Sequence, residues 1–436
     1  MRRDALTKNN NYINYKNKNG WNSLLPARQD TKELTHDKNP DVAIIGAGYT
    51  GIGAAKRWHE IAPNDEITII DASTIGEGNP GRNSGFLLEI SLANDATSKD
   101  MERMSKCNKL ISETMTRIID SVAHSDIDCQ IYRTGTYRAA AGKVGIKALK
   151  KYQNFLEKSE LEHEYLNKNK LKERIGTDFY QVGLFSPHCY LAQPAALIRA
   201  LAQNLPDEIH LYENTPALEI KKDHSYWQIE TPNASIKTKK VIIANNAFCG
   251  QLGVGKSYVS TIYTYVGLTE ALDQNSQDML GTEKNWGILP THRLGCTLRK
   301  TPDNRLMIRS LYDYGTEGNN TLIAEKLLHS LRLRFPGLKD VKFESVWGGT
   351  TGFTYNGGPL WGEINSNMYI SSGCNGGGIV KGTLFGGLLA DLANNHSVPD
   401  VNKLFGMASW MPPEPFRKIG FKLISMIERI RAKDET

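Results

Sequence analysis

Three glycine-rich segments of the chain have the composition of phosphate- and cofactor-binding turns. The first is Gly46-Ala47-Gly48-Tyr49-Thr50-Gly51. In such a pattern the first glycine permits a tight turn, the second lets the backbone approach a pyrophosphate, and the third lets a helix pack closely on a strand. Amides at the start of the following helix add a partial positive charge. The segment predicts a dinucleotide site.

An acidic residue lies where such a site needs one. Asp71 follows the apolar stretch 67–70 and stands 25 residues after Gly46. A carboxylate there can accept hydrogen bonds from ribose hydroxyls, whereas an arginine would favour a 2′-phosphate. The position therefore argues against NADP.

The elements that must hold these residues can be read from the pattern around them. An apolar strand at 42–45, the glycine turn, a helical pattern from Ile52 to Ile61 and a strand at 67–70 make one βαβ unit. Further helices are expected at 98–123, 144–159, 193–201 and 379–394. Strands are expected near 209–220, 226–231, 235–243, 295–310, 343–347 and 368–372. The globular part begins and ends with a strand, a glycine turn and a helix, and its middle is mixed.

Composition excludes several classes of protein. The 436 residues are 40% apolar and 23% charged, which suits a globular chain with a sizeable core. Six dispersed cysteines without a CxxC pattern indicate no zinc site or disulfide scaffold, and we expect a reducing, cytoplasmic location. No apolar run is long enough to span a bilayer. The net charge of +6 is modest, and its dispersed basic residues argue against a nucleic-acid partner.

The second segment carries a resemblance to a known family. Asn79-Pro80-Gly81-Arg82-Asn83-Ser84-Gly85-Phe86 resembles the Gly-Arg-Asn-Ser-Gly signature of the D-amino acid oxidase-like flavoprotein superfamily. In that superfamily this loop lies against the flavin side of FAD. The resemblance spans roughly residues 40–395 and implies FAD as the cofactor.

The third glycine segment and two strands extend the resemblance. Residues 372–379 resemble the C-terminal turn whose helix N-terminus points at the flavin ring, 215–220 resemble the strand that meets the adenine, and 240–247 the strand that returns under the cofactor. The cofactor-binding residues that the resemblance implies are Gly46, Gly48, Tyr49, Thr50, Gly51, Asp71, Ala72, Gly81, Arg82, Asn83, Ser84, Gly85, Ala217, Leu218, Ala244, Asn245, Gly373, Asn375, Gly376, Gly377, Gly378 and Ile379.

The resemblance also implies a fold. We expect an α/β protein with a Rossmann-like FAD-binding domain of the glutathione-reductase type and a mixed-sheet α+β substrate domain. We expect an N-terminal arm at 1–39, which is either anchored to the body by Trp21 or a disordered leader. The FAD-binding domain is expected to be discontinuous and to comprise 40–130, 190–250 and 340–395. The substrate-binding domain is expected at 131–189 and 251–339, and a tail with a basic amphipathic helix at 396–436.

Departures from the family pattern limit what it implies. Some relatives attach the flavin to a cysteine shortly after the position of Trp347, but Gly348-Gly349-Thr350-Thr351 contains none, so we expect non-covalent FAD and no metal. Gly377 stands where relatives often have histidine. Lys381 lies one position after the carboxylate-binding lysine of sarcosine oxidases, and is an uncertain substitute for it.

The chemistry implied is oxidation of a C–N bond by hydride transfer from the substrate to the flavin, followed by hydrolysis of the imine. The nearest branches are bacterial L-amino acid oxidases and γ-glutamylputrescine oxidase-like enzymes. We expect Arg299 to bind the carboxylate of a free L-amino acid, unless it is an ordinary strand arginine, with Lys381 and the pocket wall Trp347 as further catalytic residues. The alternative substrate is γ-glutamylputrescine or another amine.

The C-terminal segment raises a separate question. Residues 416–431 alternate bulky apolar and cationic side chains at helical spacing, so the segment could lie on an anionic membrane or pack as a surface helix. A membrane position would favour quinone over oxygen as the electron acceptor. We also expect a homo-oligomer.

Overall fold

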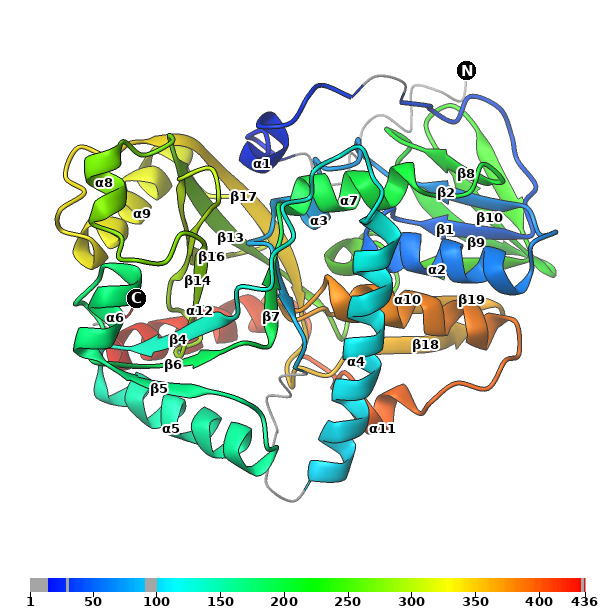
Figure 1. Ribbon diagram of the computed structural model, residues 1–436. Helices are drawn as coiled ribbons and strands as arrows, with labels where there is room; N and C mark the ends of the chain where they lie inside the picture. Colours follow the sequence, from blue (N-terminus) through cyan, green and yellow to red (C-terminus); the bar gives the residue numbers. More distant parts are fainter. Residues whose placement is uncertain (1–14, 29–30, 91–99, 433–434, 436) are drawn as a thin grey trace.

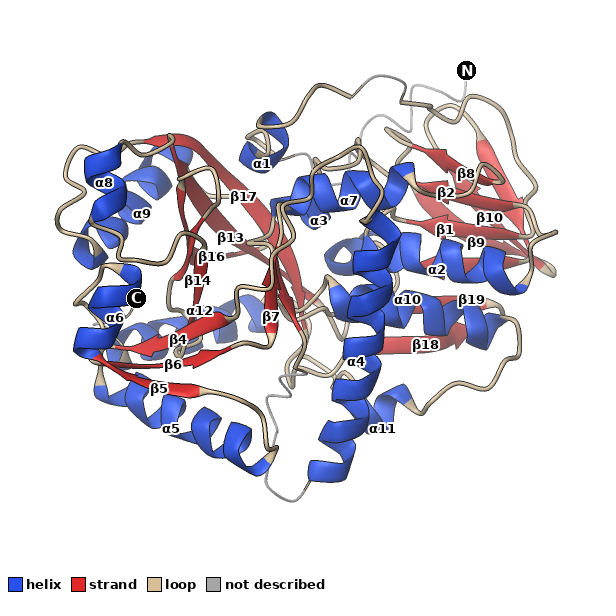
Figure 2. Ribbon diagram, viewed as in Figure 1, coloured by secondary structure: helices blue, strands red, loops and turns tan. Residues whose placement is uncertain are grey.

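The computed structural model describes residues 15–28, 31–90, 100–432 and 435. Two large sheets organise these residues into two halves that lie side by side (Figures 1 and 2). The expected α/β architecture, with a Rossmann-like half and a mixed-sheet half, is confirmed.

The first half is built on a six-stranded sheet that is parallel apart from one edge strand. Its strands run in the order β18 (Leu360–Asn365), β19 (Met368–Ser372), β12 (Lys240–Ile243), β1 (Val42–Ile45), β2 (Ile67–Ile70) and β8 (Ile209–Tyr212), and only β18 is antiparallel to its neighbour. The expected βαβ unit is therefore present, with β1 and β2 joined by helix α2 (Tyr49–Ile61).

Strand β1 shows why its residues are all apolar. Val42 and Ile44 pack with the helices on one face, whereas Ala43 and Ile45 pack with the other face under a small meander. A parallel strand covered on both sides needs apolar residues at every position. The meander consists of β9 (Glu219–Asp223), β10 (Tyr226–Glu230) and β11 (Ser235–Thr238).

The second half is built on an eight-stranded, largely antiparallel sheet. Its order is β17 (Phe343–Phe353), β13 (Ser260–Thr269), β16 (Leu306–Tyr314), β15 (Thr297–Lys300), β14 (Trp286–Pro290), β4 (Thr136–Ala140), β6 (Val182–Ser186) and β5 (Glu164–Asn167). Strand β17 pairs with β13 along its whole length. Residues 343–353 therefore belong to this sheet, and not with the FAD-binding part where we expected them; the remaining domain boundaries stay predictions.

Helices cover both sheets and connect them. They are α1 (Gly20–Ser23), α3 (Asn79–Arg82), α4 (Met101–Val122), α5 (Lys143–Lys158), α6 (Lys168–Ile175), α7 (Pro194–Gln203), α8 (Gln274–Asp278), α9 (Asn320–Arg334), α10 (Val380–Ala393), α11 (Val401–Phe405) and α12 (Phe416–Arg431), with a 3₁₀ segment at Asn246–Leu252 and a two-stranded ribbon of β3 (Phe86–Leu88) and β7 (Cys189–Leu191). In the part of the chain that the structure describes, no helix is long and apolar enough to cross a membrane.

The N-terminal arm is anchored where Trp21 enters the core. Trp21 is 1% exposed, meets Trp347 edge to face at a centroid distance of 6.0 Å, and donates from Nε1 to the carbonyl of Asn83 at 2.9 Å. This confirms Trp21 as an anchor; residues 1–14 of the arm lie outside the described part.

Helices α2 and α10 pack against each other so closely that the contact requires glycine. A Cβ atom placed on Gly386 would stand 2.0 Å from the carbonyl oxygen of Thr50, well inside any real contact. The next residue, Gly387, has room, because the nearest atom to its virtual Cβ is 3.8 Å away on Arg57. The sequence therefore sets how near the two helices come.

We predict opposite effects for two neighbouring substitutions. Gly386→Ala should lower the free energy of unfolding by about 1–3 kcal/mol, because the added methyl group forces the helices apart. Gly387→Ala should be neutral or stabilising by up to about 1 kcal/mol, because alanine favours helix. Denaturant unfolding of both variants measures this, and equal stabilities would contradict the packing described.

Candidate FAD and substrate site

Two helix N-termini face the same cavity. Gly48, which precedes α2, and Ile379, which precedes α10, make no side-chain capping hydrogen bond. The first turns of both helices line one cavity of about 1820 Å³ between the two halves. The first amides of a helix have no partner within it, so both ends offer donors and partial positive charge to an anionic ligand.

The glycine turn before α2 is held in place by close contact and by Asp71. Gly46 has a φ of +106°, and a Cβ on Gly51 would lie 1.8 Å from the Gly46 carbonyl oxygen. Neither of these two positions therefore tolerates a side chain. Asp71 accepts hydrogen bonds from the amides of Ala47 at 2.8 Å and Ser73 at 3.0 Å. Burial raises the pKa of Asp71. Its carboxylate thus fixes the turn and remains at the cavity wall, where a ribose could meet it.

The loop around Arg82 connects three parts of the chain. The Arg82 guanidinium donates to the carbonyls of Asn17, Glu77 and Gly348 at 2.6–2.8 Å and lies 3.9 Å from the ring centroid of Tyr15. Burial lowers its pKa. The Arg82 guanidinium is therefore hydrogen-bonded to the arm, to its own loop and to β17. Its main role is to position the loop, and not to bind an anionic ligand.

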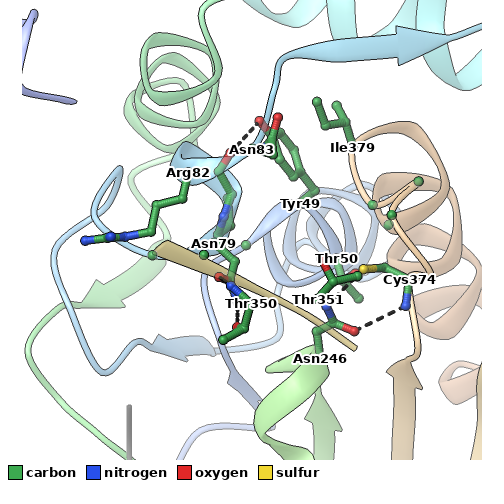
Figure 3. A pocket seen from close by; sticks show the side chains of 18 of the residues that line it. Tyr49, Thr50, Asn79, Arg82, Asn83, Asn246, Thr350, Thr351, Cys374 and Ile379 are labelled. Atoms are coloured by element: carbon green, nitrogen blue, oxygen red, sulfur yellow. Dashed lines mark hydrogen bonds between the residues drawn. The ribbon is translucent and has the colours of Figure 1, made fainter. Parts of the chain in front are cut away.

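Beside Arg82, the polar residues of the loop turn into the pocket. Figure 3 shows Asn79, Asn83 and Thr350 around it together with Tyr49 from α2 and Cys374 from the C-terminal glycine turn. Asn79 Nδ2 donates to Thr350 Oγ1 at 2.6 Å. The side-chain oxygen of Asn83, Oδ1, accepts from the amide of Gly85 at 2.8 Å. Segments 271 residues apart in the sequence therefore share one wall.

Buried polar atoms without partners show that the cavity fits a polar ligand. Ser84 Oγ and Asn245 Oδ1 both belong to cavity-lining residues, and within the described residues neither has a hydrogen-bond partner. Such atoms are costly unless a ligand or water pairs with them. Together with the uncapped helices and the volume, which exceeds a usual small-molecule pocket, they fit a dinucleotide with space left for a substrate.

Most of the residues expected to bind the cofactor reach this cavity. Those that line it are Gly46, Gly48, Tyr49, Thr50, Asp71, Ala72, Arg82, Asn83, Ser84, Ala217, Ala244, Asn245, Gly373, Asn375, Gly376, Gly377, Gly378 and Ile379. Gly51, Gly81, Gly85 and Leu218 do not line it, and the three glycines among them serve close backbone contacts behind it. Which atoms of FAD each residue meets remains a prediction.

Arg299 does not do what we expected. It is completely buried and does not line the cavity. Its Nη1 donates to the carbonyls of Ala192 at 2.5 Å and Ser84 at 3.3 Å, and burial lowers its pKa to about 10. Its Nε and Nη2 have no partner among the described residues. Through Nη1, Arg299 ties the eight-stranded sheet to the Ser84 loop, and because the side chain is fully buried outside the cavity lining it is not placed to bind a substrate carboxylate.

Of the other two residues expected at the site, Lys381 lines the cavity and Trp347 does not. Trp347 is fully buried against Trp21, donates from Nε1 to the Arg82 carbonyl at 3.2 Å, and is absent from the cavity lining because it packs beneath the loop. Lys381 lines the cavity in the first turn of α10, 6.0 Å from the ring of Phe405.

The sequence analysis missed Arg309. This residue lies on β16 and lines the cavity with Thr264, Thr297 and Tyr312. These residues belong to the eight-stranded sheet, and we call the part of the cavity that this sheet lines the substrate half. Its Nε donates to Thr264 Oγ1 at 3.0 Å, and no carboxylate of the described residues forms an ion pair with it. A cation that interrupts the apolar strand Leu306-Met307-Ile308 was the available signal.

Comparisons with known proteins agree with this geometry. The profile of a family described as FAD dependent oxidoreductase matches residues 41–392. The chain is 26% identical over 385 residues to a probable oxidoreductase of Rhizobium meliloti, covering 86% of this chain and 87% of the relative. It is 27% identical over 368 residues to the gamma-glutamylputrescine oxidoreductase of Escherichia coli, covering 81% and 83%. The crystal structure of glycine oxidase from Geobacillus kaustophilus superposes with a TM-score of 0.72 at 20% identity, covering 85% of this chain and 99% of that one.

We predict that Asp71 matters for FAD and that a similar carboxylate elsewhere does not. Asp71→Ala removes the acceptor of two amides and, if the ribose binds there, of its hydroxyls, so FAD affinity should fall at least about tenfold. The control is Asp41→Ala, because Asp41 accepts one amide hydrogen bond, from Glu66 at 3.0 Å, outside the cavity. Titration of the apoprotein with FAD by fluorescence measures both, and equal affinities would contradict the assignment.

Proposed function

The chain belongs to the FAD dependent oxidoreductase family, and from that premise we propose that it oxidatively deaminates a free L-amino acid. Family and relatives make it an FAD-dependent oxidoreductase of amines or amino acids. The proposed reaction converts an amino acid, water and a two-electron acceptor, which is oxygen or a quinone, into a 2-oxo acid, ammonia and the reduced acceptor; with oxygen, that product is hydrogen peroxide. The observation that supports an amino acid is the unpaired Arg309 in the substrate half of the cavity.

Bound FAD, held without a covalent bond, supplies the acceptor for two electrons. The residues of the chain do the rest. Thr264 fixes the Arg309 guanidinium through Nε, which leaves both Nη groups for the two oxygens of a carboxylate. A substrate held in this way presents its amine and α-carbon in one orientation, and positioning of this kind is a large part of catalysis when no strong base is needed. Lys381 and the start of α10 add positive charge at the opposite wall.

Charge favours an amino acid over a polyamine. Among the described residues, ten lysine and arginine side chains line the cavity, against two carboxylates, Asp71 and Glu77. Asp71 belongs to the glycine turn, and Glu77 pairs with Arg82. A polyamine carries a distal ammonium group that needs a carboxylate in the substrate half, where the described residues offer none. The alternative substrate, γ-glutamylputrescine or another amine, would therefore have to be recognised through a part of the molecule other than its distal ammonium group.

We predict that Arg309→Met raises the dissociation constant of an amino-acid substrate roughly a hundredfold, because a carboxylate loses two charge-assisted hydrogen bonds. An amine without a carboxylate, such as butylamine, should be affected little. Arg299→Lys, at a site without access to the cavity, should leave amino-acid affinity within about twofold. Anaerobic bleaching of the flavin measures these values, and admission of air followed by a peroxide assay tests oxygen as the acceptor. A larger loss of affinity in Arg299→Lys than in Arg309→Met would refute the assignment.

Helix α12 supports a peripheral position on the cytoplasmic face of an anionic membrane, which we propose as a second property. Its outward stripe is apolar, and its members are between 38% and 70% exposed: Phe416, Ile419, Leu423, Met426, Ile427 and Ile430. The opposite side carries the buried Ser425, and Glu428, which bonds His292 at 2.9 Å. The helix thus packs on the protein through its polar side and is flanked by Arg417, Lys418, Lys422, Arg429 and Arg431. An apolar stripe between cations suits a lipid surface.

We predict that the holoprotein floats with vesicles of phosphatidylcholine and phosphatidylserine, and less with phosphatidylcholine alone. The double variant Ile419→Glu/Leu423→Glu should abolish flotation, since it places charge in the apolar stripe. Leu322→Glu on α9, where Leu322 is 55% exposed, is the matched control. Failure of the wild-type protein to float, with a dimer that the double variant dissociates, would assign the stripe to a homo-oligomer and overturn the membrane proposal.

A further inference from the structure

A row of cavity-lining residues crosses the eight-stranded sheet from Arg309 to Arg138. Arg309 on β16 pairs with Thr297 on β15, and Leu289 on β14 pairs with Arg138 on β4. The pairing of Ile288 with Leu298 brings Leu289 next to Thr297. Residues paired laterally in a sheet project from the same face, and all four line the cavity.

The spacing of the row suits a small substrate with charge at both ends. Three strand intervals of about 4.8 Å separate the Cα atoms of Arg309 and Arg138 by roughly 14 Å. Because both arginine side chains are long, the gap between their guanidinium groups can be shorter than the gap between their Cα atoms, and can match a chain of a few carbon atoms. Between them, Thr297 and Leu289 offer a hydroxyl and an aliphatic surface, which suit the methylene groups of an amino-acid side chain.

Arg138 lacks the carboxylate partner that several other arginines of the described residues have. Arg133 pairs with Glu89, Arg174 with Glu164, and Arg305 with Asp303. The Arg138 guanidinium instead lies over the ring of Tyr152 at 4.4 Å, and its buried Nε has no acceptor among the described residues. No described carboxylate forms an ion pair with it. A planar stacked guanidinium with free donors is suited to bind an anion.

The surroundings of Arg138 reinforce its charge. Lys151 on α5 and Arg293 after β14 line the same end of the cavity. His292 lies there too and is bonded to Glu428. A second carboxylate, that of Glu435, accepts from Thr291 Oγ1 at 3.1 Å and from two backbone amides. An anion at this end therefore meets cations from three elements, and both nearby carboxylates are already hydrogen-bonded within the protein.

We infer that Arg138 binds a second anionic group at the far end of the substrate, so that the enzyme prefers a 2-aminodicarboxylic acid of the size of glutamate. This inference rests on the proposed function. Arg309 holds the α-carboxylate, the side chain lies along Thr297 and Leu289, and Arg138 holds the distal carboxylate. Arg138 is thus a residue that determines specificity.

The first test compares substrates that differ by one charge. L-glutamate should reduce the flavin anaerobically with at least tenfold lower dissociation constant than L-glutamine, which has nearly the same shape. Arg138→Gln should remove this preference by weakening glutamate and leaving glutamine within about twofold. Arg133→Gln, on a cation of the same region that pairs with Glu89 outside the cavity, should keep the preference.

The second test needs no turnover. Glutarate, which cannot be oxidised as an amine, should raise the thermal midpoint of the FAD-loaded protein and perturb its visible spectrum at concentrations at least tenfold lower than butyrate does. Arg138→Gln should equalise the two ligands. If neutral amino acids reduce the flavin as readily as glutamate, and butyrate binds as tightly as glutarate, the inference is wrong and the proposed function stands. If no amino acid reduces the flavin at all, the proposed function itself fails.

Discussion

The close packing of α2 on α10 is the constraint on which the rest of the molecule depends. The two helices come from distant parts of the sequence, and Gly386 against the Thr50 carbonyl lets their axes approach to a separation that any side chain would prevent. Because they approach so closely, their uncapped N-termini open into one cavity. A dinucleotide with a pyrophosphate at one helix and an electron-accepting ring at the other is the ligand that such an arrangement suits.

The remaining charge of the cavity is divided between structure and ligand. Arg82 and Arg299 both reach toward the loop of Ser84 and donate to backbone carbonyls, although Nε and Nη2 of Arg299 have no partner among the described residues. Arg309 and Arg138 project from the same face of the sheet as Arg299, farther into the cavity, and lack carboxylate partners among the described residues. Both side chains are half-buried, and a guanidinium in such a place is stabilised by a bound anion. Arg309 and Arg138 thus differ from Arg82 and Arg299 because they present guanidinium groups without a described carboxylate partner to the cavity.

The sequence predicts the parts of this fold that local pattern controls. The βαβ unit, the glycine turns and helix α12 at 416–431 agree with the structure because each is set by residues near in sequence. Arg299 and Arg309 could not be told apart in this way. They lie on neighbouring strands of one sheet, and only the pairing of β15 with β16, and the position of the Ser84 loop above them, decides which one reaches the cavity. The same limit applies to Trp347: a tryptophan next to glycines suits a pocket wall or the core, and only the fold shows that the arm brings Trp21 against it.

A crystal structure of the protein with FAD and a bound, unreactive carboxylate such as glutarate would test the central claim most directly. The account predicts the pyrophosphate of FAD at the start of α2, its ring beside the glycines that precede α10, and a carboxylate on the Nη groups of Arg309. A cofactor bound away from the two helix ends, or a carboxylate bound by Arg299 with Arg309 turned away, would contradict it.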